Sequence, residues 1–418
     1  MANIYPIANG TFIQSDLVEN WDDEKWQSEF NYLKQANMDY IVMSTSITTG
    51  DITKTIFQSN ILGMQMEYPQ VNIVDMCLRN AQKCGVKVFL GLDYNTDWWK
   101  KSGNDSKWLY TQMERGNLIA NELYTKYHSK YPNAFYGWYF VYEVDNLSFS
   151  CKHQFSVLSN AININLNYLK EKKQRLPLMI SPFMNSKYGT PKKYAKNWTY
   201  LFKHTDLEKG DIFCPQDSVG GGGLNIGEVK SWFCQLRKAV DTKPGLLFWA
   251  NVETFNHINW SSAPLNRFIK QMNIESVYVD NIMTFAYSHY YSPNNINDGF
   301  HKTYLSYIEK GFLENDPPTS PGNLRAKQLQ KNKISLSWEP SSDNVGIYGY
   351  EVYCNNVMIF STNVQRLYGG KKADLLTNFV DTPKLNLKEQ KLTYEVSAMD
   401  FAGNMSKPSK VIIHCSLK

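Results

Sequence analysis

The sequence predicts an α/β protein in which a (β/α)8 TIM barrel precedes an all-β sandwich. Before residue 316, short apolar runs alternate with longer amphipathic stretches; after it, apolar and polar residues alternate one by one. Near-continuous apolar strands separated by helices are typical of parallel sheets covered by helices. Eight such units in about 300 residues match the size of a (β/α)8 barrel.

The eight predicted strands are short apolar, β-rich runs that start 30 to 50 residues apart. They are Gly10–Ser15, Tyr40–Ser46, Lys87–Asp93, Gly137–Glu143, Pro177–Pro182, Asp211–Gln216, Gly245–Asn251 and Ile282–Ser288. Helical periodicity fills the gaps: Glu24–Gln35 places apolar residues on one face, and Arg115–Ser129 and Val157–Lys170 behave similarly.

A doubly wound open sheet is the alternative to the barrel. Such a sheet usually carries a glycine-rich phosphate turn after its first strand, and Ser15–Leu17 does not resemble one. The four glycines of Gly220–Gly223 lack the Lys-Ser/Thr of a P-loop. We interpret them as a flexible loop at the mouth of the barrel.

Three prolines between residues 316 and 322 predict a linker, because proline cannot continue a helix or a central strand. We therefore expect a catalytic barrel domain over 1–315, a linker over 316–322 and a sandwich over 323–418. Strand-like alternation in the last part covers Lys333–Trp338, Tyr348–Tyr353, Val357–Phe360 and Lys391–Ala398.

The amino-acid composition limits the kinds of partner that the protein can bind. Residues 1–316 carry 31 basic and 31 acidic groups, which argues against nucleic-acid binding there. No stretch approaches the roughly 20 apolar residues of a membrane span, so we expect no membrane insertion. Aromatic residues make up 14% of the chain, and apolar ring faces stack well on sugars.

The cysteines and histidines indicate neither a metal nor a cofactor. The seven cysteines contain no CxxC pair, and the seven histidines form no HExxH-type motif. No signal peptide is visible at Met1–Pro6, which fits either a cytoplasmic protein or a trimmed leader.

The C-terminal segments PPTSPGNLRA, LSWEPSSDNVGIYGYEVY and TYEVSAMDFAGNMS resemble a bacterial fibronectin type III domain. Trp338 takes the position of the buried tryptophan and Tyr394 that of the corner tyrosine. The resemblance covers residues 317–418. Because bacterial domains of this kind accompany secreted polysaccharide-degrading enzymes, it implies an extracellular or cell-surface protein with a carbohydrate target.

Two glutamates at strand ends are the candidate catalytic residues. Glu143 follows GWYFVY and Glu253 follows GLLFWANV, so each charge ends a buried strand. Active sites of (β/α)8 barrels lie at these strand ends, and paired carboxylates are the minimal apparatus of glycosidic cleavage. Asp217 is a third candidate, either as the second carboxylate or as a sugar ligand.

The barrel region is similar to retaining glycosidases that carry the acid/base on strand four and the nucleophile on strand seven. It also resembles a related bacterial barrel family of poorly defined activity, through the segments QSD, YEVDN, QDSVG and VETF. The resemblance implies Glu143 as acid/base and Glu253 as nucleophile. The asparagine that usually precedes the acid/base is replaced by Tyr142.

Polar and aromatic residues near the other strand ends are the expected substrate ligands. They are Asp16, Asp93, Tyr94, Trp98, Trp99, Tyr142, Asp145, Asn146, Asp217, Asn251, Trp260 and Tyr287.

The sequence thus predicts a secreted bacterial O-glycosyl hydrolase that acts on a poly- or oligosaccharide by a retaining two-carboxylate mechanism, with a cell-surface glycan as one option. The alternative is a non-catalytic carbohydrate-binding or scaffold protein with a degenerate barrel site. A hydrolase or lyase that holds a metal between Asp93, Glu143 and Asp217 is a third hypothesis.

Overall fold

A computed structural model describes residues 5–61, 66–67, 72–258, 260–330, 332–362, 375–385 and 389–416. Contacts divide the chain into two compact units. The first contains residues 1–257 and 268–290, and the second contains residues 258–267 and 291–418. No helix in the described ranges is long and apolar enough to cross a membrane.

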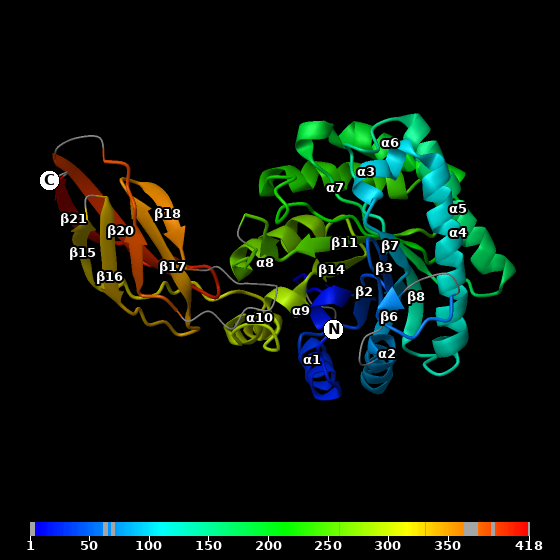
Figure 1. The fold of residues 1–418 in the computed structure, drawn as a ribbon, viewed down its shortest axis with the longest axis horizontal. Helices are drawn as coiled ribbons and strands as arrows, with labels where there is room; N and C mark the ends of the chain where they lie inside the picture. Colours follow the sequence, from blue (N-terminus) through cyan, green and yellow to red (C-terminus); the bar gives the residue numbers. More distant parts are fainter. Residues whose placement is uncertain are drawn as a thin grey trace. The chain divides into compact units, whose positions relative to one another are not determined.

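The first unit is a closed barrel of eight parallel strands, and Figure 1 shows helices surrounding them. Each strand lies within or overlaps one of the eight predicted runs, so the barrel prediction is confirmed. In chain order the strands are β1 (Gly10–Ile13), β2 (Tyr40–Met43), β6 (Lys87–Gly91), β8 (Phe135–Phe140), β9 (Leu178–Ile180), β10 (Ile212–Phe213), β11 (Leu247–Glu253) and β14 (Asn281–Phe285).

Helices lie between and after these strands, and the longer ones bury an apolar face. They are α1 (Asp23–Gln35), α2 (Ile73–Cys84), α3 (Trp98–Lys101), α4 (Ser106–Leu123), α5 (Lys152–Glu171), α6 (Pro191–His204), α7 (Ile226–Val240), α8 (Leu265–Glu275) and α9 (Tyr287–Tyr290). Capping residues in the sequence set the ends of these helices. Asp22 caps α1 through its side chain, and Gly85 ends α2 in the left-handed conformation.

The barrel closes where β1 pairs with β14, through Gly10 opposite Met283 and Thr11 opposite Thr284. A Cβ atom on Gly10 would lie 2.6 Å from the Met283 sulfur and 2.6 Å from the Tyr40 carbonyl oxygen. Thr284 Oγ1 adds a 3.2 Å hydrogen bond to the Gly10 carbonyl. The closure therefore needs a residue without a side chain at position 10.

A small second sheet extends the barrel on one side of its mouth. It consists of β5 (Met66–Glu67), β4 (Thr53–Thr55), β3 (Ile47–Thr49) and β7 (Asp93–Asn95), in that order. Because β3 follows β2 and β7 follows β6, this sheet continues two neighbouring barrel strands beyond their carboxyl ends. The strands β3, β4, β5 and β7 therefore form a wall above β2 and β6, and we refer to this sheet as the wall.

The second unit contains a β-sandwich with the fibronectin type III arrangement of three strands facing four. One sheet has the order β15-β16-β19 and the other β18-β17-β20-β21. The strands are β15 (Gly322–Gln330), β16 (Lys333–Glu339), β17 (Ile347–Cys354), β18 (Val357–Ser361), β19 (Asn378–Asp381), β20 (Glu389–Asp400) and β21 (Ser409–Ser416). As expected, Trp338 and Tyr394 lie in the core, where Tyr394 donates to Asp381 at 2.7 Å.

Helix α10 (Gly299–Lys310) and the short strand β13 (Ser261–Ser262) also belong to the second unit. The Phe300 ring lies 4.8 Å from Tyr348 and 4.9 Å from Phe401, and Tyr348 donates to the Ser262 carbonyl at 2.7 Å. The grouping by contacts therefore does not follow the proline-rich linker. The division into domains at residues 315 and 323 stays a prediction.

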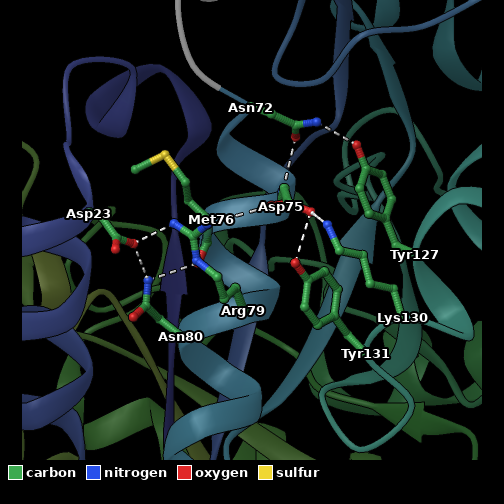
Figure 2. Close-up of polar contacts among 9 residues, drawn as sticks. All are labelled: Asp23, Asn72, Asp75, Met76, Arg79, Asn80, Tyr127, Lys130 and Tyr131. Carbon is green, nitrogen blue, oxygen red and sulfur yellow. Dashed lines mark hydrogen bonds and ion pairs between the residues drawn. The ribbon is translucent and has the colours of Figure 1, made fainter.

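A polar network ties α2 to α1 and to the π-helix Tyr124–His128 that extends α4 (Figure 2). Asp75 accepts from Lys130 Nζ at 2.6 Å and from Tyr131 Oη at 2.9 Å. Arg79, one turn along α2, pairs with Asp23 of α1 at 2.6 Å. Asp75 thus joins α2 to the segment just after the π-helix, while Asn72, the N-cap of α2, donates to the Tyr127 hydroxyl at 2.7 Å.

Replacing Asp75 with alanine should lower the free energy of unfolding by about 1–2 kcal/mol, because the buried Tyr131 hydroxyl and Lys130 both lose their acceptor. The matched control is Asp241→Ala, which removes an exposed pair with Arg237 and should cost less than about 0.5 kcal/mol. Urea unfolding followed by tryptophan fluorescence measures both. Equal losses in the two variants would contradict the structural role of Asp75.

Candidate active site

A cavity of about 330 Å³ opens at the carboxyl ends of the barrel strands. Glu143, Asp16 and Glu19 contribute carboxyl groups to it, and Phe12, Tyr139 and Phe285 form an aromatic floor. The other lining residues come from the ends of β1, β2 and β8 and from the raised wall: Gln14, Ser15, Ser44, Thr45, Ser46, Thr48, Lys54, Ile56, Tyr94 and Val141.

Glu143 follows β8 by three residues and is held from both ends. Gln216 Nε2 donates to its Oε1 at 2.9 Å, and the Trp98 indole donates to its main-chain carbonyl at 3.0 Å. Burial raises the pKa of the Glu143 carboxyl, and the nearby Asp145 carboxylate adds to the rise. The group is therefore suited to keep and to donate a proton.

Hydroxyl groups cover the side of the cavity formed by β1 and β2. The Ser15 and Thr45 hydroxyls lie 2.7 Å apart, and the Thr45 and Thr48 hydroxyls lie 3.4 Å apart. Ser46 Oγ is buried and has no hydrogen-bond partner among the described residues. Such a row of donors and acceptors suits a ligand that is itself rich in hydroxyls.

Aromatic side chains mark the rim above β6. Tyr94 lines the cavity, and the Trp99 indole lies near its hydroxyl. Burial, followed by the charge of Glu143, raises the pKa of Tyr94 to about 12, so its hydroxyl stays a donor. Trp99 is 51% exposed and lies 6.0 Å from the Phe183 ring.

Glu253 ends β11 and is only 2% exposed, although it was predicted to face the substrate. It is not among the residues that line the cavity. The Gly221 amide donates to its Oε2 at 2.6 Å, and Gly221 and Gly222 are exposed above it. The glycine loop thus covers this carboxylate.

The loop Gly220–Gly223 is more constrained than the sequence suggested. Ser218 accepts from the amides of Gly223 and Leu224 through its carbonyl, at 2.8 and 3.0 Å, and the His257 amide donates to Gly220 at 2.9 Å. A Cβ on Gly220 would lie 2.9 Å from that of Glu253, and one on Gly223 would meet the Met184 carbonyl. The segment lies at the mouth, as expected, but it is closed by hydrogen bonds.

Asp217 is fully buried beside the glycine loop. Its carboxylate accepts from the Gln271 side-chain amide and from the Val219 amide, and Gln271 also donates to the Glu253 carbonyl at 3.2 Å. Burial, followed by the Asp217 carboxylate, raises the pKa of Glu275 well above its usual range. Asp217 is thus held by α8 and the loop.

Several of the predicted substrate ligands instead form hydrogen bonds within the loops next to Glu143. Asp145 accepts from the amides of Leu147 and Ser148 at 2.6 Å, which forms a tight turn. Asn146 bonds both main-chain groups of Asn185, at 2.9 Å each. These contacts connect the loop after β8 to the loop after β9.

Asp93 and Tyr142 are also buried. Asp93 pairs with Arg115 at 2.9 Å and accepts from Thr49 at 2.8 Å, and burial raises its pKa to about 6. Tyr142 occupies the position next to Glu143, with its ring 4.8 Å from Trp98. Both lie outside the set that lines the cavity.

The other predicted ligands are placed as follows. Trp98 and Tyr287 have no exposed surface, and Asn251 is buried with its amide 3.2 Å from Ser181 Oγ. Trp260, with 48% of its surface exposed, belongs to the second unit. Of the predicted set, only Glu143, Asp16 and Tyr94 line the cavity, and Trp99 joins them through Tyr94.

Within the described ranges, no group of three or more His, Cys, Asp or Glu side chains is arranged to hold a metal ion. The carboxyl groups of the third hypothesis have different neighbours. Asp93 faces Arg115, Asp217 faces Gln271, and Glu143 faces the cavity.

Most residues that line the cavity are not among the predicted substrate ligands. Gln14, Ser15 and Ser44–Ser46 end two of the predicted strands, so their position was a usable signal. Thr48 and Lys54 come from the β3–β4 hairpin, which the strand pattern did not predict. Gln216 also ends a predicted run, and its side chain bonds Glu143 inside the barrel.

His289 fixes one of the lining residues. Its Nε2 accepts from the Gln14 amide at 2.9 Å, so α9, after the last strand, holds the end of the first. Burial lowers the pKa of His289 to about 3, which keeps the ring neutral and able to accept.

The fold and the cavity define a (β/α)8 barrel with a carboxyl-bearing pocket at the carboxyl ends of its strands. The chain belongs to the family described as "Domain of unknown function (DUF4434)", whose profile matches residues 8–297.

Similarity to other proteins is partial. A chitinase, Chi52 of Paenibacillus xylanexedens, is 47% identical over 93 residues, which are 22% of this chain and 15% of the chitinase. A solved structure titled "putative alpha-L-fucosidase", from Bacteroides thetaiotaomicron, has a TM-score of 0.58 and 22% identity. It covers 74% of this chain and 94% of its own, and at this identity the likeness shows the fold alone.

A fibronectin type III-like protein from Clostridium thermocellum aligns with 23% of this chain and 92% of its own, at 21% identity and a TM-score of 0.18. The matched segment of the chitinase is a small part of that protein, so the chitinase's activity is not transferred by the match.

His289 should make the protein acid-sensitive. Its folded pKa of about 3 lies below the ordinary 6.5, so below pH 6.5 the unfolded chain binds one more proton and stability falls. His289→Gln keeps an acceptor for Gln14 without titrating. On going from pH 7 to 5, this variant should gain about 2 kcal/mol of unfolding free energy relative to the wild type.

The exposed His204→Gln is the control and should show no such gain. Urea unfolding at each pH measures the difference, and the other histidines cancel because both proteins retain them. A constant difference between wild type and His289→Gln would show that His289 is charged or free in the folded state.

Proposed function

We propose that this protein is a glycoside hydrolase that acts on a poly- or oligosaccharide, with Glu143 as the proton donor. The observation that carries the proposal is the Glu143 carboxyl itself. It lines a cavity at the catalytic end of a (β/α)8 barrel, and burial raises its pKa. General acids of glycosidases need a carboxyl that stays protonated.

The remaining lining supports a sugar as the ligand. Hydroxyl side chains, carboxylates and the phenol of Tyr94 supply polar partners, and Phe12, Tyr139 and Phe285 supply apolar ring faces. Trp99, half exposed beside Tyr94, offers a stacking surface at the rim. Similarity to part of a chitinase and to the fold of a structure titled as a fucosidase agrees with this class.

In the proposed reaction, Glu143 gives its proton to the glycosidic oxygen as the bond to the anomeric carbon breaks. Glu253 is the second carboxylate, in line with the resemblance to retaining barrels. It attacks the anomeric carbon, and water then releases the sugar while Glu143 takes back a proton. Because the Gly221 amide covers Glu253, the glycine loop has to move from this carboxylate before it can react.

The site of action belongs to the same proposal. Fibronectin type III domains accompany bacterial enzymes that work on polysaccharides outside the cell, so we place this enzyme outside the cell or on its surface.

Replacing Glu143 with glutamine should lower kcat/KM by about 10²–10⁴, because the amide cannot donate the proton. The assay uses chito-, malto- and xylo-oligosaccharides and 4-nitrophenyl α-L-fucoside as a panel. Glu171→Gln, on an exposed helix end, is the matched control and should keep full activity. The wild-type kcat/KM should fall as pH rises through the elevated pKa of Glu143. This fall should be absent in the pH profile of Glu143→Gln.

Replacing Glu253 with glutamine tests the second carboxylate, with an expected loss of similar size. Added azide should then restore turnover and yield a glycosyl azide, because azide replaces the missing nucleophile. Full activity in Glu253→Gln would assign that role to another carboxylate. Sugar binding without turnover in the wild type would instead support the non-catalytic carbohydrate-binding protein.

A further inference from the structure

We infer that the cavity holds one end of a glycan chain, so that the enzyme removes terminal units and does not cut within a chain. The inference rests on the proposed glycoside hydrolase function. It comes from the unequal height of the barrel mouth, from the size of the cavity and from the residues that line its wall.

The wall above β2 and β6 blocks one side of the mouth. Strand β3 pairs with β4 through Ile47 and Thr48 and with β7 through Ile47–Thr49. Thr48, Lys54 and Ile56 of this region and Tyr94 of β7 all line the cavity. A chain that ran across the mouth would have to pass through a hydrogen-bonded sheet.

The opposite side of the mouth carries the glycine loop. In the order of the barrel strands, β10 lies four places from β2, so the glycine loop after β10 faces the wall. This loop is held by the His257 and Ser186 amides, at 2.9 and 3.0 Å, and Glu253 beneath it is buried. Even when the loop leaves Glu253, its anchors at both ends limit how far it opens.

The volume of the cavity suits one end of a glycan chain. At about 330 Å³ the cavity lies at the lower limit of the roughly 300–1,000 Å³ typical of small-molecule sites. An extended binding groove would need subsites on both sides of Glu143, each for one ring.

The wall is equipped to bind the hydroxyls of a terminal sugar. Ser15, Thr45 and Thr48 form a continuous row of hydroxyls, and the buried Ser46 hydroxyl has no partner among the described residues. Lys54 adds an exposed ammonium donor from the hairpin. A ring that has free hydroxyls because it ends its chain would satisfy these groups, so we assign the hairpin residues Thr48 and Lys54 to specificity.

The product pattern tests the inference. Wild-type enzyme is mixed with the hexasaccharide of each series in the panel, labelled at the reducing end, and the products are separated over time. We expect the smallest sugar to be released first, with each labelled chain shortening by one step. A mixture of internal fragments from the earliest time would overturn the inference while leaving the hydrolase function intact.

If no glycan is cleaved, the proposed function fails, and binding then decides the shape of the site. Titration calorimetry with the Glu143→Gln variant compares the disaccharide and hexasaccharide of each series. Equal affinities support a chain-end pocket. An affinity that rises more than tenfold with length indicates a groove, and the absence of binding to any series overturns both proposals.

The hairpin residue Thr48 gives a second readout. Thr48→Ala should raise KM about five- to tenfold, as expected for one lost hydrogen bond, and should change kcat less than twofold. Thr111→Ala, on the exposed face of α4, is the matched control and should change neither constant. Unchanged kinetics in Thr48→Ala, or a loss confined to kcat, would remove the wall from substrate recognition.

Discussion

The site depends on the joint between the first and the eighth barrel strand. Strands that lie more than 260 residues apart meet at Gly10 and Met283, where main chain and thioether leave no room for a side chain. Three further contacts strengthen this joint: Thr284 to Gly10, Ser288 to Thr11 and His289 to Gln14. Because Gln14 and Ser15 follow directly, the closure of the barrel also positions one side of the cavity.

The residues at the ends of the barrel strands have two different roles. Residues at the ends of β1, β2 and β8 line the cavity, where a ligand can reach them. Asp145, Asn146 and Asp217 instead form hydrogen bonds that hold loops in place. Gln216 joins these two groups, since it follows β10 and donates a hydrogen bond to the Glu143 carboxyl, which follows β8 two places away in the barrel. The outcome of this arrangement is that the Glu143 carboxyl lines the cavity and has a raised pKa.

The sequence predicted the eight strands and the sandwich because each strand is an apolar run of its own, and periodicity reports burial directly. It predicted the site less completely. Polarity at a strand end does not tell whether a side chain faces the ligand or a neighbouring loop, so Asp93 and Asp145 looked like Asp16. The hairpin with Thr48 and Lys54 was missed because its strands are three residues long and polar.

The glycine loop has a consequence for how this family can change. Exposed loops ordinarily vary freely among relatives, because their side chains meet only water. In Gly220–Gly223, a methyl group at three of the four positions would press against Glu253, His257 or Met184. Glycine is therefore required at three positions of a loop that reaches solvent at Gly221 and Gly222, whereas the exposed turn at Gly50–Ile52 of the β3–β4 hairpin can accept an insertion.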